Sequence, residues 1–451
     1  MKNQIFTFTF FWLGQISFFI FNFISSKELN VQEYGIYSIV LAVIMFGMRF
    51  MEIGIGDYYL IKGNEKGLKT IFIINFFKGI LISVVFFCSS FFFNNFYDSD
   101  QLFALIVVSS SIFVIEPLKN PLIYKFYKEK RLIPVVIIER GTYLLSTIIG
   151  VFLMLYFKSV WVLIFTYLFY FLTQTLLSYI ILPTFPSSKF DKSYAKEIIT
   201  FSKYILGFIL LTYFIRQGLD LIIPKMIGIP EFAIFSFTFL IGVSPTNFLI
   251  YPFNKLIYPV YTNEINNNSL ETVVNKVFLK TFFLIAFLSL TVYYSSPYIL
   301  DFLKHTKLFN YSLLGVVLIY SLLRGLAANL GTIFKALNKQ KAYNRILVIE
   351  AIVIFVLLFL FNQNSIEIIS VLGIAMFVHL IIGLIVLNGY ISLDLKKIGI
   401  NIAIGIALIF IELLLSYHFH IEFILIILNT LIFGVLLISF ILSLKHYFVR
   451  S

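Results

Sequence analysis

The feature that most limits the fold of this chain is a series of apolar stretches, each long enough to cross a lipid bilayer. A membrane-spanning helix needs about 20 mostly apolar residues, and about fourteen windows of the sequence meet this requirement. They lie at Gln4–Ile24, Gly35–Leu60, Thr70–Phe93, Gln101–Tyr124, Pro134–Phe157, Val160–Leu182, Ile198–Ile223, Phe232–Tyr261, Thr272–Pro297, Tyr311–Phe334, Ile346–Phe361, Ile366–Asn388, Ile398–Tyr417 and Phe423–Leu444. Because 60% of the 451 residues are hydrophobic and 12% are charged, there are too few polar side chains to cover a water-soluble globule. The sequence therefore predicts an all-α polytopic membrane protein with about 14 transmembrane helices.

The connections between these windows alternate in their content of lysine and arginine. Every second connection is rich in these cations, as at residues 62–69, 125–131, 189–196 and 335–345. The other connections hold only a few lysines: Lys27, Lys158, Lys225, Lys304 and Lys307. Cationic connections stay on the cytoplasmic side of a membrane, so both termini are predicted to be cytoplasmic. The net charge of +12 is then a signature of orientation, and we expect no nucleic acid partner.

An internal repeat divides the chain. The segment KELNVQEYGIYS (Lys27–Ser38) aligns without gaps on KMIGIPEFAIFS (Lys225–Ser236), and both fall on the predicted outer side. Repeats on the same side of the membrane are parallel and related by an axis along the membrane normal. We therefore predict an N-terminal six-helix lobe at residues 1–190, a C-terminal six-helix lobe at 191–392, and two additional helices at 393–451.

Ionisable residues inside the apolar windows are the candidate functional residues, because charge in the bilayer core is costly and usually faces a protein interior or a wet cavity. Arg49 and Glu52 stand three positions apart, and Arg216 and Asp220 stand four apart. Each pair therefore lies on one face of a helix and can neutralise itself. A second interpretation is equally open, in which these residues line a wet cavity and act on a substrate or an ion.

Three other cations have no acidic residue three or four positions away: Lys78, Lys255 and Arg324. The two lysines lie toward the cytoplasmic half of their windows, where a long side chain can reach the headgroups. Arg324 lies near the middle of its window, cannot shed its charge, and has planar donors that suit a diphosphate or an acidic sugar. It is the first candidate for substrate binding, although its partner could equally be Glu52 or Asp220.

The remaining ionisable residues of the windows are expected to be structural. Glu116 and Lys119 flank Pro117, where a kink frees a carbonyl group that can be satisfied locally. His379 is expected to be a hydrogen-bonded core residue and not a proton carrier. Three acidic residues are expected near cytoplasmic helix ends, with no special role: Asp57, Glu139 and Glu350.

Several segments together resemble the Wzx-type flippases of O-antigen and capsule oligosaccharides. They are the outward hairpin ELNVQEYGIYS (Glu28–Ser38), the stretch FMEIGIG (Phe50–Gly56) and the cytoplasmic segment KFYKEKR (Lys125–Arg131), in a chain of fourteen predicted helices. These flippases form the polysaccharide transporter branch of a superfamily that also contains multidrug antiporters and the cell-wall precursor flippase. The resemblance covers nearly the whole chain.

The resemblance implies a transporter of the bacterial inner membrane, with two six-helix lobes around a central cavity. Its substrate would be an undecaprenyl-diphosphate-linked oligosaccharide, the repeat unit of an O-antigen or a capsule, moved outward by alternating access. Membrane lipids would surround it, polymerase and chain-length proteins of the same pathway would be its partners, and no cofactor is expected. The intramembrane cations would bind the diphosphate or sugar: Arg324, Arg49, Arg216, Lys78 and Lys255. Glu52 and Asp220 would couple transport to an ion.

Two other functions remain open at this point. A cation-coupled exporter of small molecules or drugs, from the same superfamily, would rely on acidic residues such as Glu52 and Asp220. A membrane polysaccharide polymerase or ligase would need a sizeable outer loop for its catalytic residues, and no outer connection is long. The sequence also has no Ser/His/Asp grouping on loops, no metal-spaced Cys or His residues and no phosphate-binding glycine loop. We therefore expect that the protein is not an enzyme.

The predicted orientation can be tested with reporter fusions. A reporter fused at Lys128 should be cytoplasmic and one fused at Lys27 periplasmic, because lysine and arginine concentrate in the connection that contains Lys128. The measurement is the activity of a compartment-specific reporter enzyme at each site. The reverse pattern would overturn the topology.

Overall fold

The computed structural model describes residues 2–51, 54–186, 189–216, 218–266, 270–302, 308–419 and 422–449. Throughout these ranges every regular element is a helix. Among the described residues, eleven helical segments are long and apolar enough to cross a membrane. Three more helices cover the other predicted windows: α1 (Lys2–Glu28), α11 (Lys192–Arg216) and α19 (Leu395–Phe419), with 27, 25 and 25 residues. The predicted all-α polytopic membrane fold is confirmed.

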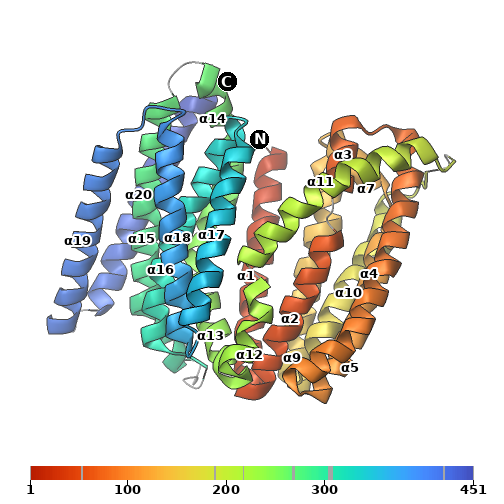
Figure 1. Cartoon of the computed structure of the whole chain (residues 1–451), viewed down its shortest axis with the longest axis horizontal. Helices are drawn as coiled ribbons and strands as arrows, with labels where there is room; N and C mark the ends of the chain where they lie inside the picture. Colours follow the sequence, from red (N-terminus) through yellow and green to blue (C-terminus); the bar gives the residue numbers. More distant parts are fainter. Residues whose placement is uncertain are drawn as a thin grey trace. The chain divides into compact units, whose positions relative to one another are not determined.

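The chain forms two compact units, residues 1–233 and residues 234–451. The first unit begins with α1 and also contains α11 (Figure 1). Its other helices are α2 (Val31–Met51), α3 (Ile55–Lys62), α4 (Leu68–Tyr97), α5 (Asp100–Ser110), α6 (Ile112–Ile115), α7 (Leu122–Lys128), α8 (Leu132–Val136), α9 (Thr142–Phe157), α10 (Trp161–Ile181) and α12 (Ile223–Ile227). Short turns join them: the 3-10 turns η1 (Glu65–Gly67), η2 (Glu116–Leu118) and η4 (Gly218–Leu221), and the π-helical turn η3 (Ile137–Gly141).

The second unit is a bundle of longer helices. It contains most of α13 (Ile229–Gly242), then α14 (Ser244–Asn266), α15 (Leu270–Phe302), α16 (Tyr311–Ala336), α17 (Gln340–Leu360), α18 (Ser365–Asn388), α19 and α20 (Glu422–Val449). Helix α18 packs against α16 and α17, α14 packs against α16, and α15 packs against α20 (Figure 1).

The two copies of the internal repeat begin a helix at equivalent residues. Helix α2 starts at Val31 and α13 starts at Ile229, which are paired in the gapless alignment. At the start of α2, Asn30 and Glu33 form a reciprocal cap, since each side chain accepts the backbone N–H of the other at 2.9 and 3.2 Å. Gly35 lies against Ile229, where a Cβ atom would stand 2.5 Å from the Ile229 carbonyl oxygen.

Helix α11 packs with the first compact unit, against α2, α3 and α4. The lobe boundary predicted at residue 190 concerns the internal repeat, and this packing does not test it. The lobes at 1–190 and 191–392 and the extra pair at 393–451 therefore stay predictions.

Several predicted windows are not continuous helices. The window Gly35–Leu60 breaks between α2 and α3, where Gly54 has a φ of 49° in the left-handed region that glycine tolerates best. The window Gln101–Tyr124 breaks at Pro117 in η2, because proline has no N–H to continue a helix. Such breaks leave backbone groups that need partners inside the protein. Three charged side chains of the first unit lie at these breaks: Lys78, Glu116 and Lys119.

Candidate functional site

Lys78 of α4 contacts the C-terminal end of α2. Its ammonium Nζ donates a hydrogen bond to the carbonyl oxygen of Met51 at 2.6 Å, where α2 ends. The last carbonyls of a helix have no partner within the helix and carry partial negative charge, so a cation there stabilises the helix end. Lys78 is therefore held by the protein backbone at a break in a membrane span.

A buried ion pair lies beside Lys78. Glu116 and Lys119 form a salt bridge around η2, and their side chains are 11% and 17% exposed. Both charges act electrostatically on Lys78. Close packing explains this meeting, since a Cβ atom on Gly79 would lie 2.3 Å from the Phe113 carbonyl oxygen. The kink at Pro117 was expected to have only a local structural role. It also places the charges of Glu116 and Lys119 beside Lys78.

A second polar group joins α2 to the end of α11. The hydroxyl of Tyr213 donates a hydrogen bond to the Ala42 carbonyl oxygen at 3.1 Å, and its ring lies 5.0 Å from that of Phe46. Arg49 of α2 and Asp220 of η4 are both within electrostatic range of Tyr213. The structure thus brings the neighbourhoods of Arg49 and Asp220 together from different helices.

Tyr97 of α4 also contacts this group. Its hydroxyl donates to the carbonyl oxygen of Leu221, directly after Asp220. Together the two groups contain three cations, Arg49, Lys78 and Lys119, and two acids, Glu116 and Asp220. A third acid, Glu139, also acts electrostatically on Lys119, so these cations and acids are equal in number.

Arg324 lies in the middle of α16, at its fourteenth of 26 residues. The nearer end of the helix is about 18 Å away along its axis, beyond the reach of the side chain. Helix α14 is fixed against α16 at this level, because Thr246 bonds to the Ser321 carbonyl oxygen at 2.6 Å and Asn254 bonds to that of Ala328 at 3.2 Å. Arg324 is half-buried, and the backbone that carries it is held in place by these bonds.

Three predicted site residues are not described to the same extent. Glu52 lies outside the described residues. Arg216 and Lys255 lie on α11 and α14, and their side chains fall outside the described part of the structure. The pairing of Arg49 with Glu52, and that of Arg216 with Asp220, therefore stay predictions.

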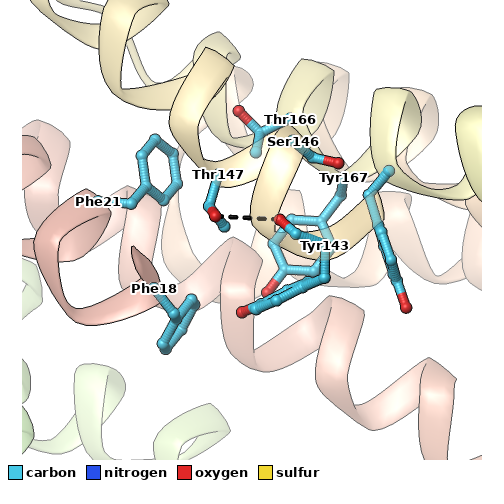
Figure 2. Close-up of a pocket in the computed structure, with 8 residues that line it drawn as sticks. Phe18, Phe21, Tyr143, Ser146, Thr147, Thr166 and Tyr167 are labelled. Carbon is cyan, nitrogen blue, oxygen red and sulfur yellow. Dashed lines mark hydrogen bonds between the residues drawn. The ribbon is translucent and has the colours of Figure 1, made fainter. Parts of the chain in front are cut away.

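A small pocket lies within the first unit, between α1, α9 and α10 (Figure 2). Aromatic and hydroxyl side chains line it: Phe18, Phe21, Tyr143, Ser146, Thr147, Thr166, Tyr167 and Tyr170. Thr147 donates to the Tyr143 carbonyl oxygen at 3.0 Å, as Figure 2 shows, and also bonds to Ser17 at 2.7 Å. The space open to the centre of a water molecule is about 10 Å³, which is close to what one water needs, so the pocket is too small for a lipid-linked sugar.

A buried acid–histidine pair in the second unit was not predicted. The expectation that Glu350 lies near a cytoplasmic helix end is wrong, because it is the eleventh of the 21 residues of α17. Its carboxylate Oε2 lies 2.6 Å from Nδ1 of His379 on α18. The expectation that His379 is a hydrogen-bonded core residue is confirmed. The sequence signal that could have linked them is the presence of one ionisable residue near the middle of each of two successive apolar helices.

Solved structures show which class of membrane protein has this fold. A lipid II flippase, MurJ, in an inward closed conformation, matches with a TM-score of 0.74 at 11% identity, covering 97% of this chain and 100% of that chain. A MATE transporter of Vibrio cholerae, VcmN, matches with a TM-score of 0.56 at 12% identity over 86% of this chain and 97% of that one. An inward-facing multidrug resistance MATE family transporter of the MOP superfamily gives 0.55 at 12% identity, over 85% and 95%. The fold is therefore the one shared by MurJ and the MATE transporters.

The sequence itself identifies the family. The model of the family described as polysaccharide biosynthesis protein matches residues 28–307, more than half of the chain. The chain belongs to this family, and the predicted resemblance is confirmed at this level. None of the curated protein sequences matches the chain.

The role of Lys78 at the end of α2 can be tested by substitution. Lys78→Met keeps a flexible apolar stem but leaves the buried Met51 carbonyl oxygen without its donor. Such an unsatisfied group costs about 1–3 kcal/mol, so the thermal midpoint of the purified protein should fall. Lys78→Arg retains a cationic donor and should recover part of the loss. An unchanged midpoint in Lys78→Met would contradict the structural role of this contact.

Proposed function

We propose that the protein is a flippase that moves an undecaprenyl-diphosphate-linked oligosaccharide across the bacterial inner membrane. The observation that carries this proposal is a permanently charged arginine, Arg324, in the middle of a membrane-spanning helix of a chain from the polysaccharide biosynthesis family. The fold, which is also that of a lipid II flippase, supports it. Transport would proceed by alternating access, with the polyprenyl tail remaining in lipid.

The charge chemistry of the spans favours an anionic head group. Arg324 presents a planar fork of donors that matches the oxygens of a diphosphate. In the first unit, Arg49, Lys78 and Lys119 are further cations in or beside the spans. A cation in a low-dielectric interior attracts an anion more strongly than it would in water. Arg216 and Lys255 are further candidates for contacts to the diphosphate or sugar.

The acidic candidates fit a coupling role in the same cycle. Asp220 lies near Tyr213 in the turn η4, which packs against α2, and Glu52 follows the last residue of α2 in the sequence. A cation-coupled exporter of small molecules would rely on these two acids, and the MATE-like fold is compatible with it. The mid-span position of Arg324, which cannot shed its charge, favours the flippase over this alternative.

The biological setting follows from the same proposal. The sugar unit would be the repeat of an O-antigen, a capsule or a related surface polysaccharide, and both termini would be cytoplasmic. Polymerase and chain-length proteins that use the exported unit would be partners. The protein would be a transporter with no enzymatic activity and no cofactor.

Substitution of Arg324 separates a substrate contact from a structural role. A charge-assisted hydrogen bond contributes about 1.5–3 kcal/mol, so Arg324→Lys, which loses the bidentate fork, should lower translocation by at least about tenfold. Arg324→Ala should abolish translocation while insertion is retained. The measurement is export of lipid-linked sugar per unit of inserted protein.

A matched control is Arg345→Ala, which removes an exposed arginine at the start of the next helix, α17. It should export normally. Undiminished export by Arg324→Ala would contradict the assignment, and so would an equal loss in both alanine variants.

A further inference from the structure

Glu350 and His379 form a deeply buried acid–base pair in the second unit. The Glu350 side chain is 3% exposed and that of His379 is 1% exposed, with 2.6 Å between Oε2 and Nδ1. The other ring nitrogen of His379, Nε2, is also buried and has no hydrogen-bond partner among the residues that the structure describes. One side of the imidazole is therefore fixed by a carboxylate, and the other side is open to a proton.

Few other charges face this pair. On α17, Tyr343 lies against the imidazole with 5.5 Å between ring centres, while Lys341 and Arg345 are exposed. On α18 itself, the only other described charge is Glu367, near the opposite end of the helix, where it bonds to Asn364.

The charged side chains of α16 also point away from the Glu350–His379 pair. Leu330 marks the face of α16 that meets α18, because a Cβ atom on Gly383 would lie 2.5 Å from its side chain. At 3.6 residues per turn, Arg324 and Lys335 point about 120° and about 140° away from that direction. Lys335 indeed lies over the ring of Tyr258 on α14, with Nζ 5.2 Å from the ring centre. No charge described on α16, α17 or α18 therefore faces the pair, and its net charge depends on the protons that Glu350 and His379 themselves bind.

The charge of the pair depends on a single proton. With an ionised Glu350 and a neutral His379, the pair carries one negative charge, and Nδ1–H donates to the carboxylate. One proton bound at Nε2 gives an imidazolium beside a carboxylate, with no net charge. Because a net charge in a dry interior is costly, the loaded and unloaded forms should favour different packing of α17 on α18. Histidine is suited to this exchange because it binds and releases protons near neutral pH.

We propose that the Glu350–His379 pair is a proton-binding site that couples transport to the proton gradient. This deepens the flippase proposal and rests on it for the transport step. In each cycle one proton would bind to His379 from the acidic outer side and leave to the cytoplasmic side, while the lipid-linked diphosphate moves outward. Each proton that binds is released again in the same cycle, so no other reactant is consumed.

Proton binding can be measured without transport. The full-length protein, labelled with ¹⁵N-histidine, contains five histidines, and the His379 signal is the one that disappears in His379→Gln. In the wild type this signal should change in one step when the pH of the sample is varied. In Glu350→Gln the change should occur at a proton concentration that differs by at least about tenfold, because the carboxylate beside the imidazole is gone. A His379 signal that does not change with pH in the wild type would overturn the proposal.

Coupling is measured in vesicles that contain the purified protein and undecaprenyl-diphosphate-linked N-acetylglucosamine as the probe. With one proton per cycle, a gradient of one pH unit can sustain about a tenfold difference in probe between the leaflets. Glu350→Gln and His379→Gln should lose this response to the gradient and keep slow, equilibrating movement. Glu367→Gln makes the same chemical change elsewhere on α18 and should respond as the wild type does.

The two measurements separate the two proposals. If the wild type moves no probe under any gradient, the flippase proposal fails, and the histidine titration still decides whether the pair binds protons. If the wild type moves the probe and both pair variants respond fully to the gradient, the coupling role is overturned.

Discussion

Lipid cannot solvate a charge or an unpaired carbonyl group, so every such group within the bilayer must find its partner inside the protein. This constraint organises both units of the structure. The ammonium of Lys78 bonds to the carbonyl oxygen of Met51, where α2 ends. Glu116 and Lys119 neutralise each other around η2. Glu350 and His379 are hydrogen-bonded to each other between α17 and α18, at 2.6 Å.

The breaks in the helices and the charged residues depend on each other. Gly54 and Pro117 interrupt spans that are otherwise apolar enough to continue as helices. Each interruption frees backbone groups, and an irregular segment at membrane depth is tolerated where protein or water surrounds it. Gly79, which has no side chain, lets α4 approach the break at Pro117 and bring Lys78 with it. The same features that would make a polar path for a diphosphate thus also hold the helices together.

Hydropathy alone predicted the helices well, because a bilayer-spanning helix must satisfy its own backbone and leaves a long apolar signal in the sequence. The helix breaks were harder to predict, since the left-handed turn at Gly54 and the π-helical turn η3 change few residues of an apolar window. The site was predictable only in part. Sequence neighbours suggested local pairs such as Arg49 with Glu52, whereas in the structure Arg49 and Asp220, which are 171 positions apart, both act electrostatically on Tyr213. The Glu350–His379 pair was missed because a contact between two helices depends on their register, which a single sequence does not reveal.

The most direct test of the flippase account is translocation of a defined lipid in vesicles that contain only this protein. The probe is undecaprenyl-diphosphate-linked N-acetylglucosamine, and an added enzyme that cannot cross the membrane modifies only the probe in the outer leaflet. The account predicts that the purified protein makes the inner-leaflet probe accessible as well, and that the undecaprenyl-monophosphate analogue crosses far more slowly. Vesicles with the protein that behave like protein-free vesicles would contradict the account.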